Sequence, residues 1–395
     1  MTDSNIYMMT HCRFTPPNDD LYHPLQVGRA LHPSLGYDGD DTGDNISSRN
    51  SEYCELTGVY WAHKNSPVPD DGIIGICHYR RCLLDDNGYI WNRSSISSDM
   101  KEHDILTTRR VTLDCSYHTG FGGRHNTSDL DKTGEALRRL YPEYYSDYER
   151  LVNQNLTYFG NMMISRRSLF DDYCSWLFDI LFETERHVDM TGYDGYAKRL
   201  YGFLSEFLLY VWVQHNALDV HECDVAVIGE KKETRIVCDK MIDHLNRHDL
   251  EGSRECLMES MSKRPDILME ASDINGNLKL LMQITAACGF EDCNDIHMLS
   301  TVPDVRKLIP VFRRLNVLTS DMVAEYRDRG LASGTVAEYR DQIYNGRCHS
   351  ASPAVNAYLT YCEQSHISRG ASRTSLQIYC SDKKEYDEIS SYLDL

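Results

Sequence analysis

The sequence predicts an α/β domain followed by a mostly helical domain. Between residues 5 and 228, short apolar runs typical of buried strands alternate with longer stretches of helical periodicity. After about residue 237 the helical patterns continue, but no succession of strands follows. A length of 395 residues also exceeds a usual single core. We therefore expect two domains, residues 1–237 and 238–395.

The N-terminal domain is expected to begin with a strand, a helix and a second strand. The apolar run at 5–10 (NIYMMT) suits a buried strand that ends at polar residues and a Pro-Pro loop. Apolar residues recur at helical spacing over 50–65, where Asn50 or Ser51 can cap the first turn. The continuous apolar run at 73–77 favours a strand covered on both faces.

Strands and helices continue to alternate after this point. The Gly-rich stretch at 119–124 lacks the spacing of a dinucleotide site, so we expect a loop there. The other expected elements are strands at 104–107, 160–165 and 224–228, and helices at 130–151 with an interruption at Pro142, at 168–185 and at 196–215. This succession favours a sheet with ligand sites at the carboxyl ends of its strands.

Charge and cysteine content narrow the class of protein. The 60 acidic and 41 basic residues give a formal net charge of -19, which disfavours nucleic acid as a partner. Fourteen cysteines without a CxxC pair, after an N-terminal stretch that lacks an export signal, indicate reduced thiols in the cytoplasm. The longest apolar run, 203–213, contains Glu206 and is too short to span a bilayer.

A cationic strand end offers a local pocket for a phosphate. The segment 78–81 reads HYRR and follows an apolar strand directly. Guanidinium groups stay ionised and donate paired hydrogen bonds that match a phosphate. Since side chains alternate along a strand, we expect only one of Arg80 and Arg81 to touch ligand. The alternative is a structural ion pair with Asp85 or Asp86.

Five motifs occur in a fixed order over residues 5–235. They are Thr10-His11, DDTGDNIS at 40–47, N..YCELTG.YW..KN at 50–65, G.CHYRR at 75–81, and GF.SE at 202–206. Together they resemble a bacterial family of capsular and exopolysaccharide glycosyltransferases. The C-terminal domain lies outside this resemblance, so its role stays unassigned.

The resemblance implies a GT-A-like, single Rossmann-like domain with a mixed sheet. Members of that fold usually hold a divalent metal, Mn²⁺ or Mg²⁺, through an Asp-x-Asp after a strand, because hard oxygen ligands suit these ions. Here the strand ends in His78-Tyr79-Arg80-Arg81. Cationic side chains are therefore candidates to neutralise the donor diphosphate, and the metal requirement stays open.

The resemblance also implies roles for particular residues. A nucleotide-sugar donor, expected to be a UDP-hexose with galactose in pyranose or furanose form, would contact Thr10, His11, Asp41, Asp44, Asn45, Asn50, Glu55, Thr57, Lys64, His78, Tyr79, Arg80 and Arg81. The acceptor, a growing glycan or a lipid-linked oligosaccharide, would contact Asn161 and His118. Each of these side chains also has an ordinary structural interpretation, in a turn, a core or an ion pair.

Glycosyl transfer to a hydroxyl group requires a base, and a carboxylate is the usual choice. Glu206 is the first candidate, because a charge within an apolar helix is costly unless it is paired or functional. Asp194, in the preceding GYDGY loop, is the second. The alternative for Glu206 is an ion pair with Arg199 or a hydrogen bond to a neighbouring backbone group.

Two other classes of protein stay open. A glycoside hydrolase would also gather carboxylates and aromatic residues around a sugar, but it would have no need of strand-end arginines. A noncatalytic assembly protein would use the C-terminal helices to recruit biosynthetic enzymes. For either class, or for a transferase, we expect a cytoplasmic protein. Peripheral attachment at the inner face of the membrane and the oligomeric state are left open.

Overall fold

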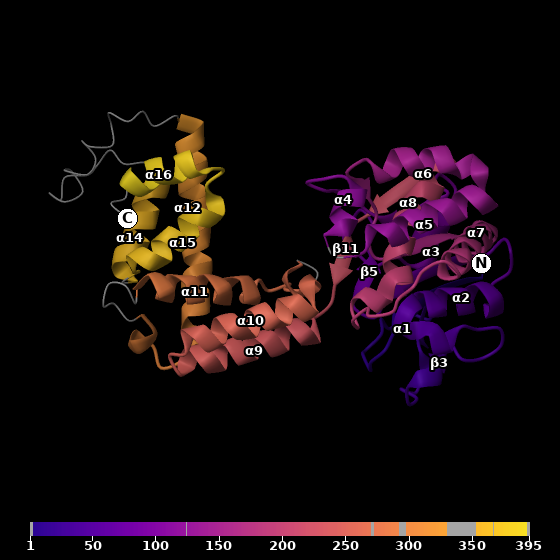
Figure 1. Ribbon diagram of the computed structural model, residues 1–395, viewed down its shortest axis with the longest axis horizontal. Coiled ribbons are helices and arrows are strands. Elements are labelled where there is room, and N and C mark those ends of the chain that lie inside the picture. The colour runs from indigo at the N-terminus through magenta and orange to yellow at the C-terminus, as the bar shows by residue number, and fades with distance from the viewer. Residues whose placement is uncertain are drawn as a thin grey trace. The chain divides into compact units, whose positions relative to one another are not determined.

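The chain forms two compact units, residues Met1–Gly229 and Glu230–Leu395 (Figure 1). The computed structural model describes residues 3–123, 125–269, 272–291, 298–329, 353–365 and 367–392. The boundary expected after residue 237 is wrong in position, because it falls inside helix α9, Lys232–Asn246. The helices of the second unit therefore begin at Lys232, before the expected boundary.

A mixed sheet forms the centre of the first unit. Its strand order is β10-β6-β9-β4-β1-β2-β3, and β5 pairs with both β4 and β11. The strands are β1 Ser4–Thr10, β2 Tyr22–Gln26, β3 Asp38–Gly39, β4 Ile73–His78, β5 Arg81–Leu83, β6 Ile105–Thr108, β9 Met163–Arg166, β10 Val220–Cys223 and β11 Val225–Val227. Strands β1, β2, β3 and β4 run parallel, as do β6 and β10, whereas β9 is antiparallel to both of its neighbours.

The helices of the first unit follow the expected order. They are α1 Asn50–Tyr53, α2 Leu56–Asn65, α3 Arg93–Asp99, α4 Tyr117–Gly122, α5 Thr127–Leu140, α6 Tyr145–Val152, α7 Arg167–Glu185 and α8 Leu200–His215. A separate small ribbon pairs β7, Val111–Thr112, with β8, Leu156–Thr157. The predicted interruption at Pro142 is confirmed, since a 3-10 turn separates α5 from α6 there.

The sheet is buried on both faces, as continuous apolar strands predict. In β1, Tyr7 and Met9 join one cluster of buried side chains, whereas Ile6 and Met8 join another. The first cluster includes residues of α2, α5, α6, α7 and α8, and the second includes Ile96 of α3. The α/β class predicted from the sequence is therefore confirmed, with helices on both faces of the sheet.

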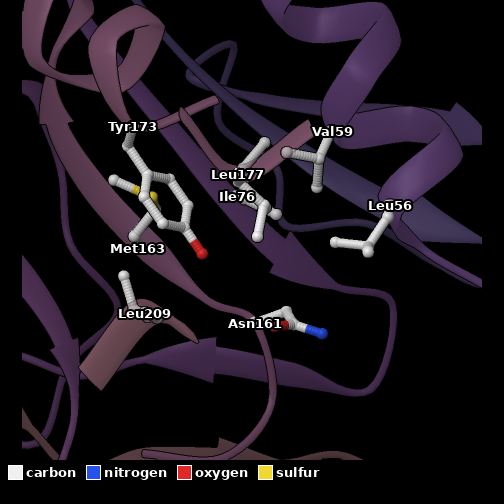
Figure 2. Close-up of a pocket in the computed structure, with 8 residues that line it drawn as sticks. All are labelled: Leu56, Val59, Ile76, Asn161, Met163, Tyr173, Leu177 and Leu209. Atoms are coloured by element: carbon white, nitrogen blue, oxygen red, sulfur yellow. The ribbon is translucent and has the colours of Figure 1, made fainter. Parts of the chain in front are cut away.

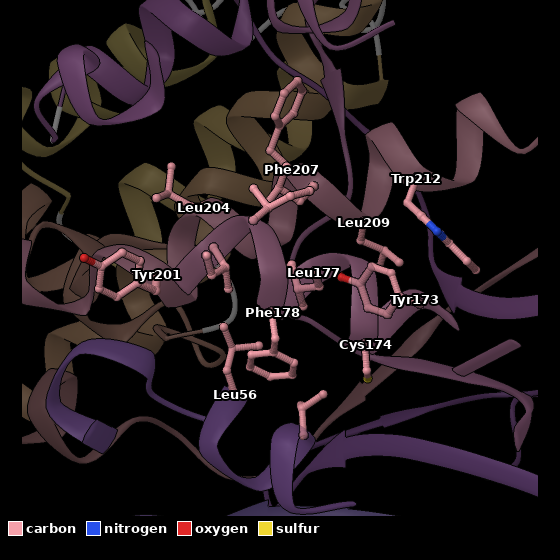
Figure 3. Close-up of a cluster of buried hydrophobic side chains, with 14 of the residues drawn as sticks. Leu56, Tyr173, Cys174, Leu177, Phe178, Tyr201, Leu204, Phe207, Leu209 and Trp212 are labelled. Carbon is pink, nitrogen blue, oxygen red and sulfur yellow. The ribbon is translucent and has the colours of Figure 1, made fainter. Parts of the chain in front are cut away.

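Helices α7 and α8 supply much of the larger core. Leu177 and Phe178 of α7 and Leu204 and Phe207 of α8 are all buried. Figure 3 shows the side chains of these two helices meeting between the ribbons. This packing fixes the position of α8, the helix that carries Glu206.

Two local predictions are wrong. The Gly-rich stretch expected as a loop at 119–124 is largely helical, because Ser116 caps the first turn of α4 through its hydroxyl. Arg124 lies outside the described residues. The single helix expected at 50–65 is broken between α1 and α2, where Cys54 adopts a left-handed φ of 51°.

The second unit is helical throughout its described residues. Its helices are α9, α10 Leu250–Lys263, α11 Asn277–Glu291, α12 Leu308–Arg329, α14 Pro353–Gln364, α15 Arg369–Tyr379 and α16 Lys383–Tyr392. They enclose a hydrophobic core of their own, which includes Met241, Leu281 and Phe312. Across the described part of both units, no helix is long and apolar enough to cross a membrane.

Candidate active site

Several predicted residues lie at one edge of the sheet. Strands β1 and β4 are parallel and β9 is antiparallel to β4, so the carboxyl ends of the first two and the amino end of the third coincide. In open α/β sheets, ligands bind outside the carboxyl ends of parallel strands. The residues placed here by the strand ends are Thr10, His11, His78, Tyr79, Arg80, Arg81, Gly160 and Asn161.

Glu206 joins this edge from α8. Its Oε1 accepts a hydrogen bond from the backbone N–H of Gly160 at 2.8 Å. Burial raises the pKa of Glu206 to about 7, and repulsion from Glu55 adds to the rise, while the Gly160 N–H, Arg81 and Arg199 oppose it. A carboxylate with a pKa near neutrality can take up and release a proton at working pH, as acid–base catalysis requires.

A second carboxylate, Glu55, is held beside Glu206. It occupies the break between α1 and α2, and its Oε1 accepts a hydrogen bond from Asn161 Nδ2 at 2.7 Å. The same amide donates to the Gly202 carbonyl, and Asn161 Oδ1 accepts from the Ser205 hydroxyl at 2.9 Å. Asn161 therefore links the start of α2 to α8 and orients the Glu55 carboxylate. Its amide is already engaged in these hydrogen bonds, whereas the sequence analysis expected it to contact an acceptor.

The turn before β9 has an unusual backbone. Gly160 has a φ of 99° and Asn161 a φ of 48°. Positive φ is uncommon for a residue with a side chain, and such strain often clusters at functional sites. Because Gly160 N–H binds Glu206 while Asn161 binds Glu55, this one turn positions both carboxylates.

His78 and Arg81 face the same turn. His78 Nε2 donates to the Gly160 carbonyl at 2.6 Å, and burial lowers the pKa of His78, with Arg81 adding to this effect. A Cβ placed on Gly160 would lie 3.7 Å from Arg81 Nη1. Among the residues that the structure describes, no carboxylate lies within ion-pair distance of Arg81. The guanidinium of Arg81 is thus a candidate partner for an anionic ligand.

Arg80 occupies a different environment from Arg81. Its Nε and Nη2 donate to the Gly229 carbonyl at 3.1 and 2.6 Å. Of the two aspartates considered as structural partners, Asp85 accepts backbone N–H groups of its own turn, and Asp86 lies 3.3 Å from His221 Nε2. The hydrogen bonds from Arg80 to the Gly229 carbonyl support the connection after β11, so we consider Arg81 the better candidate for a ligand.

The residues after β1 form a turn beside Tyr79. The buried Thr10 hydroxyl donates to the Cys12 carbonyl at 2.6 Å, so Thr10 closes this turn. The His11 ring packs edge-on against Tyr79, with ring centroids 5.2 Å apart. The Phe14 ring also packs against Tyr79, with ring centroids 5.9 Å apart. His11 and Tyr79 thus line the edge of the sheet next to the strand ends.

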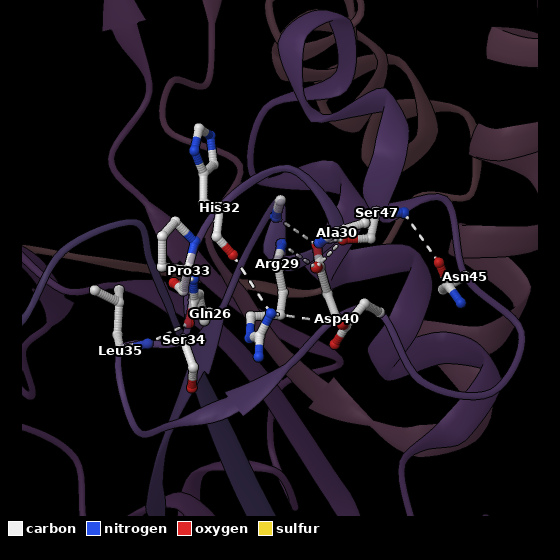
Figure 4. A network of polar contacts seen from close by, with 12 residues as sticks. Gln26, Arg29, Ala30, His32, Pro33, Ser34, Leu35, Asp40, Asn45 and Ser47 are labelled. Atoms are coloured by element: carbon white, nitrogen blue, oxygen red, sulfur yellow. Dashed lines mark hydrogen bonds and ion pairs between the residues drawn. The ribbon is translucent and has the colours of Figure 1, made fainter.

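The acidic DDTGDNIS turn is organised by Asp40, a residue that the sequence analysis did not single out. Its fully buried carboxylate accepts from the backbone N–H groups of Gly28 and Arg29, at 2.9 and 3.0 Å, and from the hydroxyls of Ser47 and Thr57. Figure 4 shows Asp40 beside Arg29 and Ser47. Four donors stabilise the charge of a buried carboxylate. Hydrogen bonds to the buried Asp40 carboxylate therefore hold the acidic turn in place.

Other predicted donor-binding residues are also tied into this turn. Asp41 forms an ion pair with Arg29 at 3.9 Å, and Asp44 accepts from the Tyr60 hydroxyl at 3.2 Å. Asn45 accepts from Ser47 N–H. Asn50 donates to the Cys54 carbonyl and to the Thr57 hydroxyl. Thr57 in turn donates to the Asp40 carboxylate. The Lys64 ammonium lies over the ring of Tyr60.

Distance along α2 separates Lys64 from Glu55. Lys64 lies nine residues after Glu55, which is about 13 Å along a helix axis. The structure thus divides the predicted donor-binding residues into a group beside Glu206 and a group around the Asp40 turn.

Two predicted residues lie elsewhere. Asp194 is exposed, and its Oδ1 accepts from the backbone N–H groups of Tyr196 and Ala197, both at 2.8 Å. It therefore caps a 3-10 turn before α8. His118 on α4 is paired with Asp131 at 3.1 Å. The partners of these two side chains are therefore groups other than Glu55, Glu206 and Asn161.

A small cavity lies on the core side of Asn161. It is lined by Leu56, Val59, Ile76, Asn161, Met163, Tyr173, Leu177 and Leu209 (Figure 2). Its volume has room for about one water molecule, so it is too small for a sugar ring. This cavity is therefore not a sugar-binding site.

Arg81 offers a phosphate a charged partner at this edge, whereas among the residues that the structure describes no group of three metal-ligating side chains converges there. Within the described residues, the group of three ligating side chains that could hold a metal lies at another edge of the sheet. Glu55 and Glu206 bring carboxylate oxygens to this edge, and such oxygens are ligands that Mn²⁺ and Mg²⁺ accept.

The fold is an α/β domain of the GT-A-like class, and a carboxylate with a raised pKa and a cationic side chain lie at its strand ends. Residues 5–217, more than half of the chain, match the family described as "Domain of unknown function (DUF4422)". The chain belongs to this family.

A solved structure gives a further comparison. It is titled "WbbM bifunctional glycosytransferase apo structure", and it is similar over 57% of this chain at 28% sequence identity, with a TM-score of 0.53. The similarity covers 45% of that protein, so this chain matches less than half of its length. No curated protein matches the chain significantly.

Proposed function

We propose that this chain is a glycosyltransferase that moves a hexose from a UDP-sugar to a growing cell-surface polysaccharide or a lipid-linked oligosaccharide. The observation that carries the proposal is that Glu206, whose pKa burial raises to about 7, lies at the same strand ends as the Arg81 guanidinium, which acts on it electrostatically without forming an ion pair. Family membership and the similarity to a glycosyltransferase structure support the same class of reaction.

Each group has a defined task in this reaction. Glu206 accepts the proton of the acceptor hydroxyl as its oxygen bonds to the anomeric carbon of the donor. The bond between that carbon and the diphosphate oxygen breaks, and Arg81 stabilises the negative charge on the departing nucleotide. Glu55, fixed by Asn161, is placed to bind sugar hydroxyls. The neutral His78 keeps the Gly160 turn in position through its Nε2–H.

The finer assignments extend the resemblance described above. Galactose, in pyranose or furanose form, is the proposed sugar, and the cytoplasm, with peripheral attachment to the membrane through a lipid-linked acceptor, is the proposed location. Mn²⁺ or Mg²⁺ is the proposed ion if one is required, with carboxylate oxygens of Glu55 or Glu206 as ligands. Adding EDTA to the transfer reaction separates a metal-dependent enzyme from one that relies on Arg81.

Nucleotide release tests the proposal directly. The purified chain is incubated with a panel of nucleotide sugars, with and without glycan acceptors, and free nucleotide is measured. We expect release from a UDP-hexose, and a fall of about 10²- to 10⁴-fold in the Glu206→Gln variant, because the base is lost while the hydrogen bond from Gly160 is kept. Asp194→Asn is the matched control, since this carboxylate only caps a turn. No release from any donor would contradict the proposal.

A glycoside hydrolase is the second candidate, because Glu55 and Glu206 form a carboxylate pair with one raised pKa. Thermal unfolding in the presence of UDP discriminates between the two classes. A transferase that binds the nucleotide is stabilised by it, whereas a hydrolase is indifferent. Stabilisation by UDP that disappears in the Arg81→Gln variant supports the transferase. Hydrolysis of glycans in the absence of nucleotide supports the glycoside hydrolase.

A further inference from the structure

Three metal-ligating side chains converge at the sheet edge opposite to the candidate active site. Asp99 is the last residue of α3, His103 precedes β6, and His221 is the second residue of β10. Because β10 runs parallel to β6, the amino ends of these strands bring the three residues together. One ligating atom from each residue lies within 4.8 Å of the other two.

Asp99 is shared between the two histidines. Its Oδ1 lies 2.7 Å from His221 Nδ1, and its Oδ2 lies 3.2 Å from His103 Nδ1. The two imidazole rings contact each other, with centroids 5.0 Å apart at an angle of 62°. The side chains of Asp99 and His221 are 12% and 13% exposed, so the group is largely withdrawn from solvent.

Two atoms of this group lack hydrogen bonds. Asp99 Oδ2 and His103 Nδ1 are both buried, and neither has a hydrogen-bond partner, although they face each other at 3.2 Å. Buried polar atoms are nearly always paired, and an exception often marks an ion or a water molecule. A cation between the two atoms would accept a lone pair from each of them.

The surroundings of His221 suit a metal ligand. Its second nitrogen, Nε2, lies 3.3 Å from Asp86 Oδ1, and the ring packs edge-on against the buried Trp91 at 5.4 Å. Histidines that bind metals usually donate the hydrogen of their other nitrogen to a carboxylate, which fixes the tautomer. Asp86 is therefore placed to hold a hydrogen on Nε2 when Nδ1, which here donates to Asp99 Oδ1 at 2.7 Å, exchanges this hydrogen bond for an ion.

We propose that Asp99, His103 and His221 bind a divalent transition metal of the zinc class. Two imidazole nitrogens and one carboxylate oxygen are ligands that Zn²⁺ accepts at about 2.0–2.2 Å, with water in a fourth position. Magnesium and calcium prefer all-oxygen ligands, so they fit this set less well. The bound ion would tie α3 and the segment before β6 to the edge strand β10. This site is independent of the proposed transferase activity.

Metal binding to the full-length chain tests this proposal. Protein treated with a chelator is dialysed against Zn²⁺, and the bound metal is measured; Co²⁺ then replaces Zn²⁺ as a spectroscopic probe. We expect one equivalent of Zn²⁺, no competition by Mg²⁺, and the visible absorption of tetrahedral Co²⁺. His221→Ala should lower the affinity by at least about 100-fold, because a direct ligand is lost. His215→Gln is the matched control, since His215 forms a simple pair with Asp147 at 2.9 Å.

A milder variant guards against unfolding of the His221 variant. Asp86 is 85% exposed, so Asp86→Asn should fold, yet it should weaken Zn²⁺ binding by about 10-fold through the orientation of His221. Absence of the Co²⁺ spectrum, or equal Zn²⁺ affinity in the parent, Asp86→Asn and Asp99→Asn proteins, would overturn the proposal.

Discussion

At the scale of single residues, the candidate active site depends on Glu206, a carboxylate that burial and repulsion from Glu55 make costly to ionise. The pKa of Glu206 is raised to about 7 from an ordinary value of 4.5. Between these two pH values the folded chain keeps a proton that the unfolded chain has released. Folding stability therefore falls as the pH rises through this window.

Glu206→Gln should remove this pH dependence. Glutamine keeps the acceptor for Gly160 N–H but carries no charge, so we expect the variant to be more stable than the parent by about 1–3 kcal/mol at pH 8, with little difference at pH 5. Chemical denaturation at both pH values measures the difference. The exposed Glu149→Gln serves as the control. If parent and variant gave parallel curves of stability against pH, Glu206 would be an ordinary surface-like carboxylate.

The two adjacent arginines should respond differently to substitution. Arg81→Gln should weaken UDP binding by about 10- to 100-fold, because a charge-assisted hydrogen bond to phosphate is lost. Arg80→Gln should leave UDP affinity nearly unchanged and lower the thermal stability instead, since Arg80 donates to the Gly229 carbonyl. Calorimetric titration with UDP and thermal unfolding separate the two effects. A loss of affinity in Arg80→Gln alone would reverse these assignments.

At the scale of elements, the sequence predicts helices and strands well where apolar residues recur at regular spacing. β1, β4, β6, α7 and the break at Pro142 lie close to their predicted positions, because burial on one or both faces leaves a clear pattern. The short strands β2 and β10 escaped prediction, since β2 contains Pro24 and β10 reads VHEC. Their strand conformation comes from pairing with β1 and β6, and no local pattern records such pairing.

The candidate site was predictable in the same uneven way. Glu206 stood out as a charge in an apolar helix, and 78–81 as a cationic strand end. The roles of Gly160 and Asp40 could not be read from spacing, because each acts through a neighbour distant in sequence. Asp194 is the second candidate for the base in the sequence, and only the structure shows that its carboxylate caps a turn.

The acidic turn makes a prediction at this scale, because the Thr57 hydroxyl connects α2 to Asp40. Thr57→Val removes a donor from a buried carboxylate while keeping the side-chain volume, so we expect a loss of about 1–3 kcal/mol in unfolding free energy. Thr57→Ser keeps the hydroxyl and should cost less. Denaturant unfolding measures both, and UDP affinity should change little in either variant. A selective loss of UDP binding in Thr57→Val would instead place this turn in the donor site.

At the scale of the whole molecule, each unit has a hydrophobic core of its own. The residues proposed for catalysis, Glu55, Arg81, Asn161 and Glu206, all belong to the first unit. A unit with its own core can fold by itself in principle. The second unit is therefore a candidate for recruitment of acceptors or partner enzymes rather than for chemistry.

Division of the chain at Gly229 tests this separation of roles. We expect residues 1–229 to unfold cooperatively and to keep most of the nucleotide release, because the sheet and both of its faces stay intact. Circular dichroism during heating and the donor assay measure the two properties. Residues 1–237 are the matched control, since this cut leaves the first turns of α9 without the rest of their helix and should lower solubility. If residues 1–229 fold but release no nucleotide while the full chain does, the helical unit contributes to catalysis itself.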